Sequence, residues 1–135
     1  MKTFAEPHMN HIDVKITYAC NFKCEYCYQV DENGKRQKGV LSKEHAENLL
    51  KFIDKLGLKF TVTLAGGEPF AYPHLEFLVR GLSERGCEVI LITNFSAPLE
   101  RIIEVVRLCK GNMKGISISI HLSQWIDIQE LYNKR

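Results

Sequence analysis

Apolar residues in this sequence follow two alternating spacings, one typical of strands and the other of helices. Polar and apolar side chains alternate along residues 11–17, which predicts a strand, and apolar residues then recur at helical spacing between 46 and 56. The same order repeats, with further strands expected at 61–65, 88–93 and 115–121 and further helices at 75–82 and 99–106. Strands that alternate with helices of this length require a parallel sheet with right-handed crossovers. The sequence therefore predicts an α/β fold.

The residues best suited to chemistry follow the predicted strands. Three cysteines come after the first strand, Gly66–Pro69 after the second and Asn94 after the third, and His121 ends the fourth. In parallel sheets of this kind, ligands gather at the C-terminal ends of the strands. We therefore expect these residues to share one site at that edge of the sheet.

Cys20, Cys24 and Cys27 form a C-x3-C-x2-C pattern with no fourth cysteine nearby. A [4Fe-4S] cluster normally takes four thiolates, so three would leave one iron open to another ligand. A structural zinc site is an alternative, although it usually needs a second pair of ligands, and chance spacing is another. Since Cys87 and Cys109 stand alone and the total of five cysteines is odd, we expect two buried structural thiols and no disulfide framework.

A run of Gly66, Gly67, Glu68 and Pro69 follows the second predicted strand directly. Two glycines permit backbone angles that are closed to other residues and let a ligand approach the main chain closely. An acidic side chain and exposed carbonyls at a strand end suit an ammonium group. Taken alone, the run also fits an ordinary strand-to-helix turn.

The cysteine pattern, with Tyr26 before its last cysteine, and the Gly66–Pro69 run together resemble the radical S-adenosylmethionine (SAM) superfamily. The resemblance implies a partial (β/α) barrel, a [4Fe-4S] cluster held by the three cysteines, and SAM bound to the open iron. It further implies reductive cleavage of SAM to a 5′-deoxyadenosyl radical, which abstracts hydrogen from a substrate. That substrate could be a peptide, a cofactor precursor or another small molecule, and the electron donor a flavodoxin or ferredoxin.

The resemblance also assigns residues to SAM. It implies that the loop of Gly66, Gly67, Glu68 and Pro69 receives the methionine ammonium group and that the Tyr26 backbone lies against adenine. At the end of the fourth strand, it makes Ser119 a contact of the SAM ribose or carboxylate.

Two further positions depart from the family pattern. Asn94 resembles the Asn of a Thr-Asn-Gly turn, with Phe95 in place of the glycine, so Asn94 is a candidate SAM contact or simply an Asx turn. His121 stands where many relatives carry an acidic residue. Because histidine titrates near neutrality, His121 is a candidate acid–base group, but a strand-end histidine without chemistry fits equally well.

The predicted strands number four, whereas the radical SAM core usually has six strand–helix units. We therefore expect residues 1–135 to be one radical SAM core domain that continues in a longer protein. Leu122 and the residues after it look like the start of another helix. Two other function classes stay open, namely a non-catalytic zinc or iron–sulfur domain and an inactive fragment of a longer enzyme.

Composition narrows the possible partners and the compartment only modestly. A formal net charge of +2, without a clustered basic segment, is no nucleic-acid signature, and the apolar runs are too short to cross a membrane. Free thiols and an oxygen-sensitive cluster would both favour a reducing cytoplasm.

Overall fold

The computed structural model describes residues 10–22, 27, 33, 35, 38–121 and 133. Two of the predicted site residues, Cys24 and Tyr26, lie outside the described residues, and so does the helix expected from Leu122.

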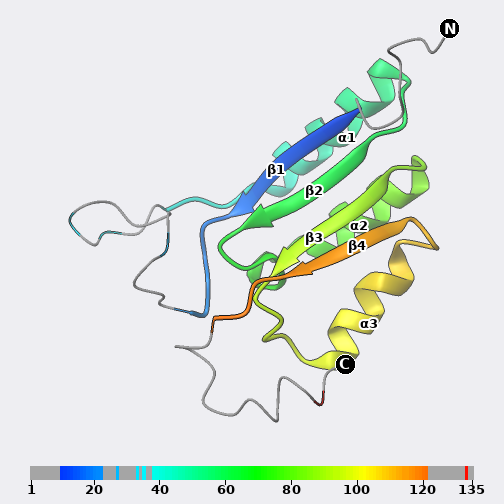
Figure 1. The fold of residues 1–135 in the computed structure, drawn as a ribbon. Coiled ribbons are helices and arrows are strands. Elements are labelled where there is room, and N and C mark those ends of the chain that lie inside the picture. Colours follow the sequence, from blue (N-terminus) through cyan, green and yellow to red (C-terminus); the bar gives the residue numbers. More distant parts are fainter. Residues whose placement is uncertain are drawn as a thin grey trace, which may run out of the picture.

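A single sheet of four parallel strands forms the centre of the fold, in the order β1-β2-β3-β4 (Figure 1). The strands are β1 (His11–Thr17), β2 (Thr61–Gly66), β3 (Glu88–Thr93) and β4 (Met113–Ile118). Their arrowheads in Figure 1 all point to the same edge of the sheet. The predicted α/β class and parallel pairing are confirmed.

Three α-helices connect the strands, as the apolar spacing predicts. They are α1 (Lys43–Leu56), α2 (Leu75–Glu84) and α3 (Leu99–Leu108), and a short 3-10 helix, η2 (Pro69–Ala71), precedes α2. The hydroxyl of Ser42 caps α1 by accepting the N–H of His45 at 3.1 Å. Gly57 ends the same helix in the left-handed conformation, with a φ of 64°.

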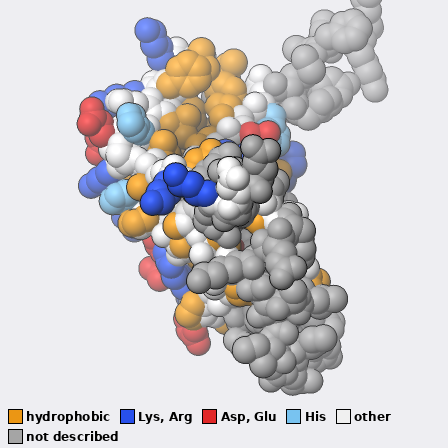
Figure 2. Space-filling view, turned by 90° about the vertical axis from the view of Figure 1, so that its left-hand side faces the viewer, with side chains coloured by type: hydrophobic (Ala, Val, Ile, Leu, Met, Phe, Trp, Pro, Cys, Tyr) orange, Lys and Arg blue, Asp and Glu red, His pale blue; other side chains and the backbone are white. Residues whose placement is uncertain are grey.

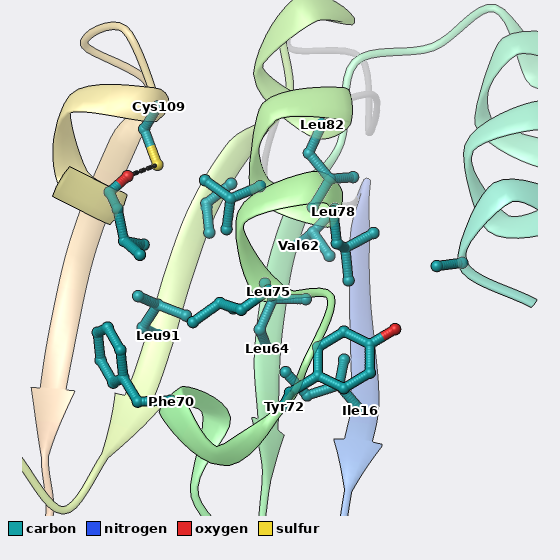
Figure 3. Packing of buried hydrophobic residues seen from close by; sticks show 14 of the residues in the cluster. Ile16, Val62, Leu64, Phe70, Tyr72, Leu75, Leu78, Leu82, Leu91 and Cys109 are labelled. Carbon is teal, nitrogen blue, oxygen red and sulfur yellow. Dashed lines mark hydrogen bonds between the residues drawn. The ribbon is translucent and has the colours of Figure 1, made fainter. Parts of the chain in front are cut away.

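The hydrophobic core lies between the helices and one face of the sheet (Figure 3). Alternate residues of the two central strands point into it, namely Val62, Leu64, Val89 and Leu91. Cys87 and Cys109 are both fully buried, which confirms the prediction that they pack in the interior. Burial raises the pKa of the Cys109 thiol to about 11, so this thiol stays protonated at neutral pH.

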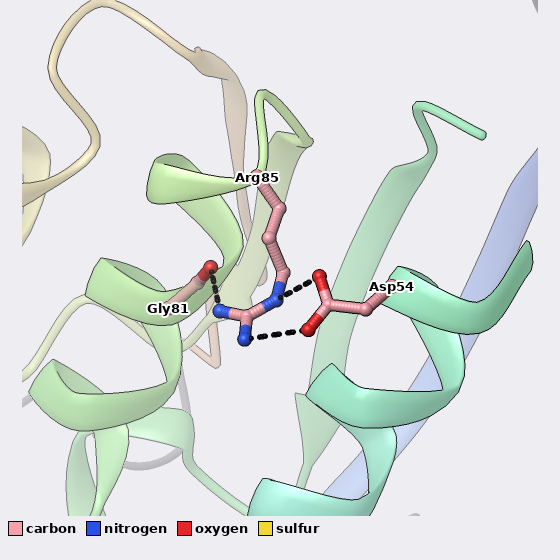
Figure 4. A network of polar contacts seen from close by, with 3 residues as sticks. All are labelled: Asp54, Gly81 and Arg85. Atoms are coloured by element: carbon pink, nitrogen blue, oxygen red, sulfur yellow. Dashed lines mark hydrogen bonds and ion pairs between the residues drawn. The ribbon is translucent and has the colours of Figure 1, made fainter. Parts of the chain in front are cut away.

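α1 and α2 approach each other closely at Gly81. A Cβ atom added there would lie 2.5 Å from Leu50 Cδ1, so a larger residue would require the Leu50 side chain to shift. Near the ends of both helices, the Arg85 guanidinium binds the Asp54 carboxylate with two hydrogen bonds of 2.8 and 2.9 Å (Figure 4). Arg85 also donates to the carbonyl of Gly81 at 2.9 Å, which satisfies one of the last carbonyls of α2.

β4 differs from the strand predicted at 115–121. It begins and ends earlier, at Met113 and Ile118, because its partner β3 ends at Thr93, which pairs with Ile118. A register shift between Val89 and Ile90 lengthens the paired segment at its start. The alternation of isoleucines continues to Ile120, but this residue is more than half exposed, at 57%. Ser119 and His121 therefore follow the strand instead of ending it.

Charged residues of both signs are mixed on one face of the described part of the molecule (Figure 2). On the face seen in Figure 2, basic side chains lie among acidic, histidine and hydrophobic ones over the described residues. Within the part of the chain that is described, every helix is too short or too polar to span a bilayer.

Candidate functional site

Several of the predicted site residues that the structure describes gather at the C-terminal edge of the sheet. Cys20 follows β1, the Gly66–Pro69 run begins at the last residue of β2, and Asn94 follows β3. Hydrogen bonds join these segments to one another.

The turn after β2 holds the chain that leads into the cysteine loop. The N–H of Gly67 donates to the Thr17 carbonyl at 2.6 Å, and the N–H of Glu68 donates to the Ala19 carbonyl at 2.8 Å. A Cβ atom on Gly66 would lie 2.0 Å from Thr17 O, and one on Gly67 would lie 2.1 Å from Ala19 O. Gly66 also has a φ of 150°, which side chains disfavour. The sequence predicts that a ligand approaches closely here, whereas in the structure the close neighbour of both glycines is the backbone of residues 17–19.

The carboxylate of Glu68 is buried and joins the β2 turn to the end of β3. Its Oε1 accepts the hydroxyl of Thr93 at 2.5 Å and the N–H of Phe70 at 3.2 Å. Its Oε2 accepts the N–H of Asn94 at 2.7 Å. Three donors satisfy a side chain that is only 2% exposed, which is what a carboxylate out of water requires.

The side chain of Asn94 connects the β3 turn to the cysteine loop. Its Oδ1 accepts the N–H of Ser96 at 3.0 Å, which confirms the Asx turn, and the Ser96 hydroxyl at 2.6 Å. Its Nδ2 donates to Asn21 Oδ1 at 2.9 Å and to Cys20 Sγ at 3.8 Å. Phe95, which stands where the family pattern has glycine, has the left-handed φ of 61° that glycine would favour.

The cysteines that the structure describes fit an iron–sulfur cluster. Cys20 and Cys27 are both partly buried, and Cys20 Sγ accepts the N–H of Phe22 at 3.4 Å as well as the Asn94 amide. Hydrogen bonds to ligand sulfurs are characteristic of protein-bound clusters. No group of three potential metal ligands forms among the described residues, a set that does not include Cys24.

The segment after β4 contacts the cysteine loop. The ring of His121 lies edge-on to that of Phe22, with centroids 6.0 Å apart and an interplanar angle of 88°. The N–H of Ser119 donates to the Thr93 carbonyl at 2.9 Å, so Ser119 stays beside the end of β3. The two predicted residues of this segment are therefore at the same edge as the cysteines.

Three polar residues that sequence reasoning missed belong to the same network. They are Asn21, Thr93 and Ser96, and Asn21 Nδ2 donates to Ser96 Oγ at 2.8 Å. Beside them lies a cavity of about 260 Å³, which Asn21, Glu68, Ser96 and Arg101 help to line. The only available signal was position, since each of the three residues lies within two positions of a predicted site residue in the sequence.

Comparisons with known proteins agree with this geometry. The family model of the radical SAM superfamily matches residues 14–134. A probable GTP 3′,8-cyclase of Saccharolobus solfataricus is 32% identical over 118 residues, which are 87% of this chain and 36% of that protein. A GTP 3′,8-cyclase of Rhizobium leguminosarum is 27% identical over 115 residues, or 83% of this chain and 32% of that protein. The chain thus spans about a third of the length of these curated relatives.

A solved structure shares the fold. The crystal structure of BtrN in complex with AdoMet and 2-DOIA matches with a TM-score of 0.74 at 16% identity, over 93% of this chain and 51% of that one. At this identity the likeness concerns the fold, and it supports the partial barrel that the four parallel strands form. The chain belongs to the radical SAM superfamily, whose enzymes use a [4Fe-4S] cluster and SAM.

Proposed function

We propose that this chain carries the cluster and SAM sites of a radical SAM enzyme. Cys20, Cys24 and Cys27 would be the three protein ligands of a [4Fe-4S] cluster. The observation that carries the proposal is the attachment of the cysteine loop to Gly67 and Glu68 through hydrogen bonds of 2.6 and 2.8 Å. A loop held this firmly in place at its start is suited to present thiolates in a fixed geometry.

SAM would bind at the same edge, between the loops that follow the strands. We assign its methionine end to the loop of Gly66, Gly67, Glu68 and Pro69, its adenine to the backbone of Tyr26, and its ribose or carboxylate to Ser119. The Glu68 carboxylate already accepts from Thr93, Phe70 and Asn94. The carbonyls of Glu68 and Pro69 accept the N–H groups of Ala71 and Tyr72. We therefore assign the ammonium group to the backbone of the two glycines. Asn94 would lie at the edge of this site, where it either contacts SAM directly or supports the cysteine loop.

When both cofactors are bound, they supply the reductive cleavage of SAM to methionine and a 5′-deoxyadenosyl radical that abstracts hydrogen from a substrate. We assign the acid–base role to His121, and its ring contact with Phe22 of the cysteine loop supports this assignment. The substrate would be a small molecule or a peptide. GTP is the first compound to test, since the relatives described above are named for it.

A structural zinc site is the competing function for the cysteines. A zinc site of that kind has closed tetrahedral coordination and needs a fourth ligand. It also has no use for a glycine pair packed on the strand end or for a buried carboxylate that links two turns. These two features favour the enzyme. A reductant such as flavodoxin or ferredoxin would then be required, in a reducing compartment such as the cytoplasm.

Anaerobic reconstitution with iron and sulfide tests the proposal. We expect a brown protein with about four irons per chain. Cys24→Ala should abolish the cluster, whereas Cys87→Ala, at a buried cysteine away from the site, should leave it intact. With dithionite and SAM, the full-length protein should release 5′-deoxyadenosine. One tightly bound zinc per chain, together with refusal of iron, would contradict the proposal.

A further inference from the structure

The side chain of Asn94 uses its whole hydrogen-bonding capacity within the protein. An asparagine amide has two N–H donors and an oxygen with two lone pairs. The two N–H groups serve Asn21 Oδ1 at 2.9 Å and Cys20 Sγ at 3.8 Å. Both lone pairs are taken by Ser96, through its N–H at 3.0 Å and its hydroxyl at 2.6 Å. No donor of this side chain is left over for a ligand.

Several contacts fix the direction of this amide. The backbone N–H of Asn94 donates to the buried Glu68 carboxylate at 2.7 Å, and the next residue, Phe95, is held in the left-handed conformation. Asn21 Nδ2 donates to Ser96 Oγ at 2.8 Å, which closes a ring of three side chains. Asn94 is itself 4% exposed. A side chain held from this many sides is preorganised, so its N–H points at the Cys20 sulfur without a further cost of ordering.

From this arrangement we propose that Asn94 is a positioning residue that acts through Cys20 and raises the reduction potential of the bound cluster. The inference rests on the proposed function, because it needs a cluster on Cys20. Reduction adds one negative charge to the cluster, and part of that charge resides on the ligand sulfurs. An N–H dipole directed at one of those sulfurs stabilises the reduced form more than the oxidised form.

Asn94→Asp isolates the donor half of the amide. The aspartate keeps an oxygen for the N–H and hydroxyl of Ser96, so the Asx turn is preserved, but it replaces the N–H donors with a second oxygen. We expect the equilibrium constant for one-electron reduction to fall at least tenfold, which is 59 mV. Asn94→Ser also keeps an acceptor for the turn and lacks the amide donors, without adding charge, and its potential should lie between those of Asn94→Asp and the wild type.

The measurement is a redox titration of the reconstituted protein without SAM, followed by the EPR signal of the reduced cluster. Asn48→Asp is the matched control, because Asn48 lies on the exposed face of α1 and the change adds the same charge away from the site. Its reduction constant should stay within about twofold of the wild type, since solvent screens a distant surface charge.

The outcomes separate this inference from the proposed function. Clusters that form in all variants with equal potentials overturn the inference alone, whereas a wild type that forms no cluster overturns both. Unchanged potentials combined with weakened SAM binding in Asn94→Ser would make Asn94 a SAM contact instead. If Asn94→Asp does not fold, the potential of Asn94→Ser decides, and a value equal to that of the wild type refutes the role of the amide.

Discussion

Gly67→Ala is the smallest change that tests how the cysteine loop is held. The new Cβ atom would lie 2.1 Å from Ala19 O, 2.5 Å from Ala19 C and 2.7 Å from Tyr18 O. Every one of these neighbours is backbone, so no side chain can simply turn away. Gly67 has no left-handed φ, and the substitution therefore tests the contact without adding conformational strain.

The expected loss of stability in Gly67→Ala follows from the contacts that the new Cβ atom would displace. An ordinary contact begins at 3.4 Å, so Ala19 O has to move by about 1.3 Å from its present 2.1 Å. Such a shift breaks or stretches the hydrogen bonds from Gly67 N to Thr17 O and from Glu68 N to Ala19 O. At about 1 kcal/mol each, with a buried donor left unpaired, the expected loss in free energy of unfolding is about 1–3 kcal/mol. Cys20 would be displaced too, and a misplacement of about 1 Å can cost about 100-fold in rate.

Urea unfolding followed by circular dichroism measures the loss of stability, and iron content after reconstitution measures the displacement of Cys20. Gly115→Ala is the control, because it is also a glycine-to-alanine change, has no atom within 4 Å of its new Cβ, and has no left-handed φ. It should change stability by less than about 0.5 kcal/mol. Wild-type stability and full iron loading in Gly67→Ala would refute the view that this contact positions the cysteines.

Three further outcomes are expected. Glu68→Gln places an amide donor against the donors of Thr93 or Asn94, and it should lower the free energy of unfolding by about 1–3 kcal/mol in a urea titration. Its control is Glu76→Gln, at a partly exposed ion pair with Arg101, which should lower the free energy of unfolding by less than about 1 kcal/mol. Burial raises the pKa of Cys109 from 9.0 to about 11, so the unfolded chain loses this proton first and stability should decline between pH 9 and 11. Cys109→Ala should flatten that part of the pH profile. Arg85→Met removes a paired guanidinium but keeps an apolar stem, and it should cost about 0.5–1 kcal/mol at low salt and less in 1 M NaCl.

The periodic spacing of apolar residues was sufficient to predict most of the strands and helices. β1 and β3 have the predicted bounds, and α1 begins after Ser42 and ends at Gly57 as capping rules require. β4 was the exception, because alternation records which face a side chain prefers and not where the neighbouring strand stops. The end of β3 at Thr93 and the register shift near Val89 decide the bounds of β4, and neither has a local signal in residues 113–121.

The position of the site was predictable, but its contacts were not. Parallel topology places every strand end at one edge, and the order β1-β2-β3 makes the segments of Cys20, Glu68 and Asn94 adjacent there. Which atoms meet there depends on distances of a few tenths of an ångström between segments far apart in sequence. Asn94 and Asn21, for example, are separated by 73 residues and still join at 2.9 Å. Glycine freedom at Gly66 likewise signals a close approach without revealing that the approaching group is the chain's own backbone.

Phe95 shows how a sequence can depart from a motif and still keep its geometry. The family pattern has glycine after Asn94, and here the backbone retains the left-handed φ of 61° with a phenylalanine. That conformation costs roughly 1–2 kcal/mol for a residue with a side chain. The Phe95 ring is only 8% exposed and packs in the core, and burying such a ring contributes about 1.5–3 kcal/mol. Packing thus offsets the strain that glycine would avoid, and the turn still directs the Asn94 amide at Cys20. Membership of the site is therefore better judged from backbone conformation at this position than from the identity of its residue.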